Sequence, residues 1–219
     1  MALVVETVDI DLSYQVFFTE PQLELSKENN RLKLVGNVLR TFGLRLNDLK
    51  YNQETPSNNS IHFSKFFGRA FFDVSLGYEE CTAKLRNPID KNQALEIYGG
   101  FAQIIESIPI SHQNIFIQQH LSTNGDATDH LSSLNPICPE NFATFLQQSG
   151  VHYTLKIPDH ELTIHVTLVG SLFVQGGLYL NENLHFIPNR YDFKKTYELS
   201  TEYHEFILKE LGLKMKENL

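Results

Sequence analysis

Two stretches of this chain carry nearly the same pattern, and this repeat constrains the possible fold more than any other feature. The first is IHFSKFFGRAFFDVSLGY, residues 61–78, and the second is VHYTLKIPDHELTIHVTLVG, residues 151–170. Both start with an apolar residue, a histidine, an aromatic residue and a hydroxyl residue, then pass through a short turn into alternating apolar and polar residues. Because alternation with a period of two is typical of a half-buried strand, each stretch is predicted to be a β-hairpin.

The elements around the two hairpins also correspond. In each half a strand-like run and a helical pattern come before the hairpin, and a further strand and a second helical pattern follow it. In the first half the strand-like run is residues 12–18 and the two helical patterns are residues 29–43 and 90–107. In the second half the strand-like run is residues 114–121 and the two helical patterns are residues 138–150 and 196–214. This order predicts an α+β protein with an internally duplicated β-α-β-β-(β)-α unit, residues 1–110 and 111–219. Its strands are expected to form one or more antiparallel sheets with the helices on one face.

The ends of several elements can be predicted from capping residues. Asp90 is a candidate N-cap for the helix over 90–107, and Gly43 and Gly212 suit the ends of two other helices. Residues 29–43 remain open between helix and strand, because the apolar residues at 32, 34 and 35 fit both periods. Residues 52–60 and 122–136, rich in Asn, Ser, Thr, Gly and Pro, are predicted to be surface loops.

The alternation divides each hairpin into an apolar face and a polar face. The turn positions are predicted to place His62 across from Asp73 and His152 across from His165, with hydroxyl residues beside them. The apolar face would pack on the core. The polar face is either a solvated surface or a binding or catalytic site, and alternation alone already predicts the solvated surface.

The two motifs His-Phe-Ser at 62–64 and His-Tyr-Thr at 152–154 resemble those of the 2H phosphoesterase family. In that family two His-x-Ser/Thr motifs meet in a cleft between pseudo-symmetric lobes, and the enzymes cleave phosphodiesters of RNA ends and cyclic nucleotides. The resemblance implies that His62 and His152 act as base and acid and that Ser64 and Thr154 hold phosphoryl oxygens. Such an enzyme would be a metal-independent phosphodiesterase.

A zinc site is a further alternative for the second hairpin. His152, His160 and His165 are close in sequence, and imidazole is a common zinc ligand. Elsewhere the chain has no glycine-rich phosphate loop, so no cofactor is expected, and the two cysteines have no metal-ligand spacing. Glu79 and Glu80 beside Cys81 are expected to raise the pKa of that thiol.

Composition favours a binding protein over an enzyme. The formal net charge of −8 argues against nonspecific binding to nucleic acid, and 42% hydrophobic residues are ordinary for a globular chain. No signal peptide and no stretch long enough to span a bilayer are expected, which favours a soluble cytoplasmic protein. We therefore expect a non-enzymatic interaction module that binds another protein or a second copy of itself, with the phosphoesterase as the alternative.

Overall fold

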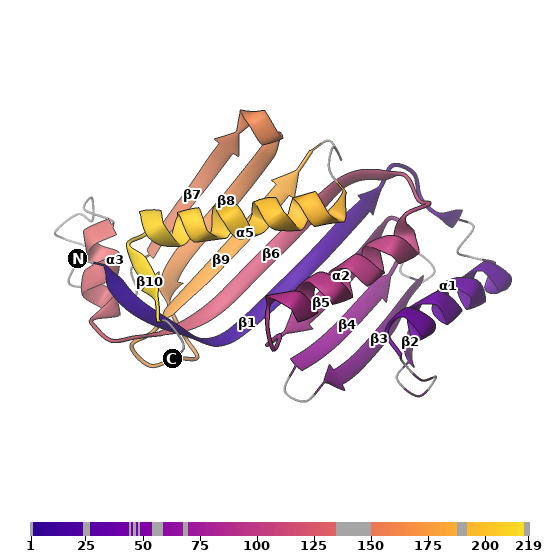
Figure 1. Cartoon of the computed structure of the whole chain (residues 1–219), viewed down its shortest axis with the longest axis horizontal. Helices are drawn as coiled ribbons and strands as arrows, with labels where there is room; N and C mark the ends of the chain where they lie inside the picture. Colours follow the sequence, from indigo (N-terminus) through magenta and orange to yellow (C-terminus); the bar gives the residue numbers. More distant parts are fainter. Residues whose placement is uncertain are drawn as a thin grey trace. The chain divides into compact units, whose positions relative to one another are not determined.

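The computed structural model describes residues 2–23, 27–43, 45, 47, 49–53, 59–67, 70–134, 150–187 and 192–216. The described part is a mixed α/β structure with mostly antiparallel strands, so this part of the fold prediction is confirmed (Figure 1). In chain order the elements are β1 (Leu3–Phe18), α1 (Glu28–Thr41), β2 (Leu49–Gln53), β3 (Asn59–Phe67), β4 (Ala70–Leu76), β5 (Glu80–Arg86), α2 (Lys91–Ile105), β6 (Ile110–Thr123), α3 (Ala127–Leu134), β7 (Gly150–Ile157), β8 (Leu162–Gly170), β9 (Leu178–Phe186), α5 (Phe193–Glu210) and β10 (Leu213–Met215).

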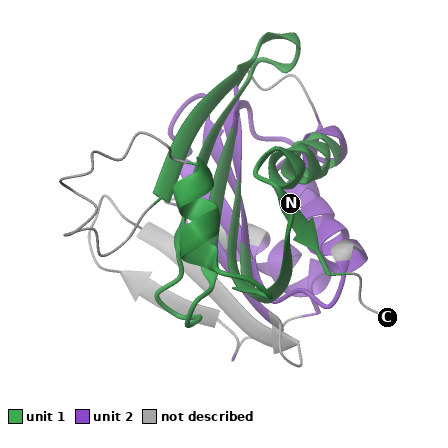
Figure 2. Ribbon diagram, turned by 90° about the vertical axis from the view of Figure 1, so that its left-hand side faces the viewer, with its two compact units in different colours: residues 1–11, 116–184, 198–219 green, residues 12–115, 185–197 purple. Residues whose placement is uncertain are grey.

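The hydrogen-bonded strands follow the order β2-β3-β4-β5-β1-β6-β9-β8-β7, and β10 pairs with β1 in parallel. The chain divides into two compact units, coloured separately in Figure 2. Unit 1 comprises residues 1–11, 116–184 and 198–219, and unit 2 comprises residues 12–115 and 185–197. Parts of the long strands β1, β6 and β9 therefore belong to each unit.

The core of unit 2 is an aromatic cluster between α2 and β1. Phe101 on α2 is fully buried, and its ring meets the ring of Tyr14 edge-on at 5.8 Å between centroids. Tyr98, one turn earlier on α2, lies 6.1 Å from the same tyrosine ring. The Tyr14 hydroxyl donates a 2.9 Å hydrogen bond to Gln113 Oε1, so its polar atom is satisfied inside the core.

Helix α2 begins at the predicted cap. The Asp90 carboxylate accepts a 2.8 Å hydrogen bond from the Gln93 backbone N–H. We expect Asp90→Ala to lower the free energy of unfolding by about 1 kcal/mol, because one amide of the first turn loses its partner. Chemical denaturation measures the change. Asp90→Asn keeps a capping oxygen and should lose much less, and an equal loss for both variants would contradict this role.

The core of unit 1 lies between β8, β9 and α5. Burial alternates along β8 and β9, and the buried residues in unit 1 are Leu162, Ile164, Val166, Leu168, Leu178, Leu180, Glu182 and Leu184. One member of this set is charged. Glu182 is completely buried, and both of its carboxylate oxygens lie 3.0 Å from Nδ1 of His204 on α5. Burial raises the pKa of the Glu182 carboxyl, and the His204 hydrogen bond opposes that rise only in part.

This raised pKa makes a pH-dependent contribution to stability. A carboxyl with a higher pKa in the folded chain favours folding below its unfolded pKa, and that contribution is lost as the pH rises through the folded pKa. We therefore expect the unfolding free energy of the wild type, relative to Glu182→Gln, to fall as the pH rises from about 4. Urea titrations over a pH series measure this difference. Glu202→Gln, at an exposed position of α5, is the control. A difference between wild type and Glu182→Gln that does not vary with pH would contradict the expectation.

Two helix predictions are confirmed, the open alternative at residues 29–43 is resolved as a helix, and one loop prediction is wrong. Helices α1, α2 and α5 match the patterns at 29–43, 90–107 and 196–214, so the strand alternative for the first is rejected. The predicted loop over 122–136 contains α3, because Asp126 caps a helix there by accepting hydrogen bonds from the amides of Thr128 and Asp129. The predicted helix at 138–150 lies outside the described residues except for Gly150. The predicted loop at 52–60 overlaps the end of β2 and the start of β3, and its residues 54–58 lie outside the described part.

Both predicted hairpins are present, but their registers differ from the predicted ones by two residues. His62 is paired with Ser75, and Asp73 is paired with Ser64. In the second hairpin His152 is paired with Thr167, because the turn contains a 3-10 helix over 158–160 and is longer than the sequence suggested. A shift of two residues keeps each side chain on its predicted face.

Candidate functional site

Two histidines and two threonines form a cross-strand cluster where β7 and β8 pair. His152 Nδ1 lies 2.9 Å from Thr167 Oγ1, and Thr154 Oγ1 lies 3.1 Å from His165 Nδ1. The two imidazole rings are nearly parallel, with centroids 6.3 Å apart. The predicted site residues of this half thus have their hydrogen-bond partners on the neighbouring strand, and all of these side chains belong to one exposed face of unit 1.

The other predicted site residues, His62 and Ser64, belong to β3 in unit 2. The structure describes the backbone pairing of β3 but not its side chains. A shared site for His62 and His152 therefore stays a prediction.

The proposed zinc ligands do not gather. The ring of His160 lies against Tyr203, with centroids 6.1 Å apart, while His152 and His165 face each other as described above. Within the described ranges, no group of three or more His, Cys, Asp or Glu side chains could hold a metal ion.

The Cys81 thiol is buried and its pKa is raised to about 12, first by burial and then by Glu80, in the predicted direction.

The same face of unit 1 carries a pocket of about 410 Å³ near the end of β8, within the size range of ligand sites. His165, Thr167 and Val169 alternate along β8, and Val169 lines this pocket. Three further strands and one loop complete the wall. The lining residues are Asp9 and Asp11 of β1, Gln118 and His120 of β6, Tyr179 of β9, Val169 and Gly170 of β8, and Leu172 and Phe173 of the loop that follows. We call it the acidic aromatic pocket.

Three rings form one wall of the acidic aromatic pocket. The His120 imidazole is stacked on the Tyr179 ring, with centroids 4.8 Å apart and an angle of 30°. The Phe173 ring also makes a T-shaped contact with this imidazole, with centroids 4.7 Å apart. Offset stacking and edge-on contacts are the favoured aromatic geometries, so the rings hold one another in place.

The loop over residues 171–177 is fixed by its own hydrogen bonds. Ser171 Oγ accepts hydrogen bonds from the amides of Phe173 and Val174, at 3.1 and 2.9 Å. The Ser171 amide donates to the Gly177 carbonyl, and the Gly177 amide donates to the Val174 carbonyl. The loop therefore holds Phe173 in a defined position.

The same serine connects the loop to β6. Ser171 Oγ lies 2.9 Å from His120 Nδ1. Through its two amide contacts and this side-chain contact, the serine links the loop backbone to the imidazole of His120.

The charged residues among the described lining of the pocket are both acidic. Asp9 and Asp11 line it, and as far as the chain is described no lysine or arginine does. Burial raises the pKa of the Tyr179 hydroxyl, and the negative charge of Asp11 raises it further. The carboxylate of Asp11 and the tyrosine therefore interact across the pocket wall.

Two apolar residues at the rim are unusually exposed. Leu172 is 88% exposed and Phe173 is 84% exposed, the two highest values among the large hydrophobic residues that the structure describes. A single exposed leucine is ordinary, but adjacent apolar residues on a fixed loop beside a pocket are typical of a binding surface.

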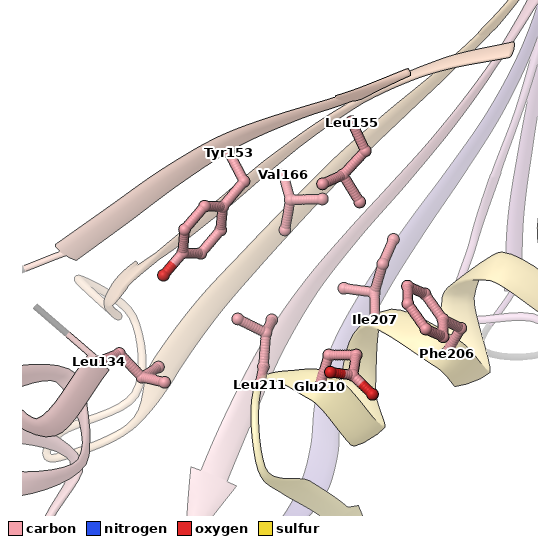
Figure 3. A pocket seen from close by; sticks show the side chains of 8 residues that line it. All are labelled: Leu134, Tyr153, Leu155, Val166, Phe206, Ile207, Glu210 and Leu211. Carbon is pink, nitrogen blue, oxygen red and sulfur yellow. The ribbon is translucent and has the colours of Figure 1, made fainter. Parts of the chain in front are cut away.

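A second pocket of about 260 Å³ lies on the opposite face of β7 and β8, against α5 (Figure 3). Side chains of Tyr153, Leu155 and Val166 face those of Phe206, Ile207 and Leu211 across it, and Leu134 lies at one end (Figure 3). Glu210 is its one charged lining residue among those described. Apart from Glu210 and the Tyr153 hydroxyl the described lining is apolar, so it offers few groups to orient a ligand.

No protein-family model matches the chain, and a comparison with curated proteins finds no match. None of the helices in the described part has the length and apolar character needed to cross a bilayer. Functional conclusions therefore depend on the geometry of the chain itself.

The acidic aromatic pocket was not predicted from the sequence. Its residues come from positions 9 to 179, so no local motif connects them. One signal was present: SLFVQGG at 171–177 places Leu and Phe between a serine and a Gly pair, where a turn is expected.

Proposed function

We propose that this chain is a non-enzymatic binding module of the cytoplasm whose protein partner binds at the acidic aromatic pocket. The observation that carries this proposal is the exposure of Leu172 and Phe173 on a loop held by hydrogen bonds. Water contacts nearly all of both side chains in the free protein, and a partner that covers them gains their burial, about 1.5–3 kcal/mol for each fully buried side chain. The loop is already ordered, so little conformational entropy is lost when a partner binds.

The surroundings of this pair suit a protein interface. Energetically dominant residues of interfaces are enriched in aromatics and lie beside pockets, with polar groups around them. Here Phe173 contacts His120, which is stacked on Tyr179, and the carboxylates and the amide of Gln118 supply polar groups.

We further propose that the chain arose by duplication of segments 1–110 and 111–219, with helices on one face of the sheet. The support is the order of the described elements: β1, α1, β3, β4, β5 and α2 correspond to β6, α3, β7, β8, β9 and α5, and β2 is an additional strand of the first segment. The open face of such a sheet would then carry the binding surface.

Affinity capture from extracts of the cells that make the protein tests the binding proposal. The bait is the wild type, the double variant Leu172→Ser/Phe173→Ser, or the control Ile89→Ser, whose side chain is 75% exposed and lines none of the pockets described above. We expect a stoichiometric partner with the wild type and the control, and a loss of at least about tenfold with the double variant, the effect of 1.4 kcal/mol in binding free energy.

Two outcomes would contradict the proposal. The first is equal capture of the same partner by all three baits. The second is no partner at all together with a monomer by light scattering. A wild-type dimer that dissociates in the double variant would instead identify the partner as a second copy of the chain.

The second candidate function is a 2H-type phosphoesterase. The specific observation in its favour is the hydrogen bonding of His152 and Thr154 to residues of β8 on one exposed face, which leaves a polar surface around the imidazoles. A panel of cyclic and RNA-end phosphodiesters incubated with the wild type and His152→Ala tests it. Turnover by the wild type that His152→Ala removes would support the enzyme, and no turnover on the panel would contradict it.

A further inference from the structure

We infer that the edge strand β7 pairs in antiparallel orientation with β7 of a second copy of the chain, centred on Thr154, so that the two sheets become continuous. The inference goes beyond the proposed function, because this interface lies along a strand edge and not at the acidic aromatic pocket. It follows from the unpaired edge of β7, from the exposed apolar side chains beside it and from the self-complementary pattern of its residues.

Strand β7 has a free backbone edge. It ends the strand order, and among the described strands its one partner is β8 (Figure 1). Every second residue of an antiparallel strand turns its N–H and C=O away from a given neighbour, so alternate residues of 151–157 present these groups along the outer edge. Proline, bulges and inward-pointing charges commonly protect such edges. β7 contains no proline, and its one lysine, Lys156, is exposed on the polar face. This edge can therefore accept a further strand.

The apolar side of the same edge is incompletely covered. Tyr153 is 40% exposed and Phe206 of α5 is 46% exposed, and both line the pocket of about 260 Å³ together with Leu155 (Figure 3). A strand added beside β7 would lie about 4.8 Å away, and its apolar side chains would contact those of Tyr153 and Leu155. The added strand would thus supply main-chain partners and also cover apolar surface that water contacts in the single chain.

The sequence of β7 suits pairing with another β7. In VHYTLKI, residues 151–157, apolar and polar residues alternate symmetrically on both sides of Thr154. An antiparallel pair centred on Thr154 places Tyr153 opposite Leu155 of the second copy, and the two ends of the segment opposite each other. Apolar side chains therefore meet apolar ones on one face, and polar side chains meet polar ones on the other.

The charges and the main chain favour the same centre. Lys156 lies opposite the imidazole of His152 of the second copy, so no two lysines are directly opposed. A centre nearer to the turn would bring residues opposite Pro158, which has no N–H to donate. The formal charge of −8 on each copy opposes association over long distances, but salt at about 0.15 M screens charges that are more than about 8 Å apart. Contacts between neighbouring strands act within that distance.

The first test is sedimentation equilibrium of the full chain from about 1 µM to 1 mM, a range that includes the dissociation constants of weak and moderately stable dimers. We expect the wild type to show a monomer–dimer equilibrium. Tyr153→Lys should weaken the dimer at least about tenfold, because it places two ammonium groups diagonally across the two-fold axis on the apolar face. Ile89→Lys adds the same charge at a position that is 75% exposed and outside the described strands, and it should leave the equilibrium unchanged.

Two results of this test would overturn the inference. One is a wild type that remains monomeric over the whole range of concentration. The other is a dimer that Tyr153→Lys and Ile89→Lys weaken to the same extent.

Cysteine variants test the register. They are made in a Cys138→Ser background, in which the remaining native cysteine, Cys81, is buried. Thr154→Cys places two thiols opposite each other with Cβ atoms about 4.5–5.5 Å apart, so mild oxidation should link the two copies. Lys156→Cys is the control, because its thiols lie four residues apart along the paired strands, roughly 14 Å, and cannot form a disulfide. Cross-linking through Lys156→Cys, or none through Thr154→Cys in a chain that dimerises, would overturn this pairing.

The dimer and the binding at the acidic aromatic pocket can fail separately. Leu172→Ser/Phe173→Ser changes the rim of that pocket and should remain dimeric, and Tyr153→Lys should still capture the partner of the pocket. A double variant that becomes monomeric would assign the dimer contact to the rim and overturn the pairing of β7. A double variant that loses the captured partner and remains dimeric would support both proposals.

Discussion

Replacement of Phe101 by alanine is expected to lower the free energy of unfolding by about 3–5 kcal/mol, the range for a fully buried phenylalanine. Phe101 is 0% exposed and its ring contacts Tyr14, which itself is buried and is bonded to Gln113. Truncation removes the ring from the centre of this cluster. The cavity that remains cannot close completely, because Tyr14 is held both by its hydroxyl and by its neighbours in the sheet.

Leu95→Ala on the same helix is the control for this prediction. Leu95 is 37% exposed, so the same kind of truncation removes a side chain that keeps partial contact with water. Urea denaturation of both variants under one set of conditions gives the two changes. Equal losses for Phe101→Ala and Leu95→Ala would show that the aromatic cluster is not the core of unit 2.

Gly177→Ala is expected to displace the loop that forms the rim of the acidic aromatic pocket. A Cβ atom at Gly177 would lie 2.4 Å from the Leu121 carbonyl oxygen and 2.6 Å from Val174 Cγ1, and the first of these is a backbone atom of β6. The strand and the loop must therefore separate. We expect a loss of about 1–3 kcal/mol in unfolding free energy, as for overpacked sites, and weaker capture of the partner.

Gly36→Ala is the matched control, because it also adds one methyl group. Gly36 lies inside α1, and apart from its own helix backbone and its chain neighbours no atom of the described residues lies within 4 Å of the added Cβ position. The substitution should stabilise the chain by about 0.5–1 kcal/mol, since alanine favours a helix over glycine. Hydrogen exchange at residues 171–177 separates the two variants: faster exchange in Gly177→Ala and unchanged exchange in Gly36→Ala are expected. Unchanged exchange in both would contradict the close packing at Gly177.

Much of the fold could be predicted because local rules determine it. The period of two in residues 162–168 and the helical stripe that includes Leu199 and Ile207 both follow from burial of one face. The N-cap at Asp90 follows from the chemistry of its side chain. These features need only a few consecutive residues, and a sequence displays them directly.

The errors came from longer turns and from a missed cap. Asp126 starts a helix inside a stretch whose Ser, Thr, Asn and Gly content suggested a loop. The hairpin registers depend on the conformation of the turns, and Glu161 adopts the left-handed region at φ 47°, which extends the second turn beyond the simplest expectation.

The candidate site shows a different limit. The polar face around His152 could be predicted from alternation, and His152 lies on that face with Thr167. The pocket on the same face could not, because Asp11, His120 and Tyr179 become neighbours only through the strand order β1-β6-β9. That order depends on which long strands pair, and local periodicity does not contain this information.

Hydrogen exchange of the protein bound to its captured partner tests the central claim most directly. If the partner covers the acidic aromatic pocket, the amides of residues 171–177 and of the start of β9 become more slowly exchanging in the complex, while those of β7 near His152 change little. Unaltered exchange at residues 171–179, with protection located elsewhere on the chain, would contradict the claim that this pocket and its exposed Leu-Phe pair form the binding surface.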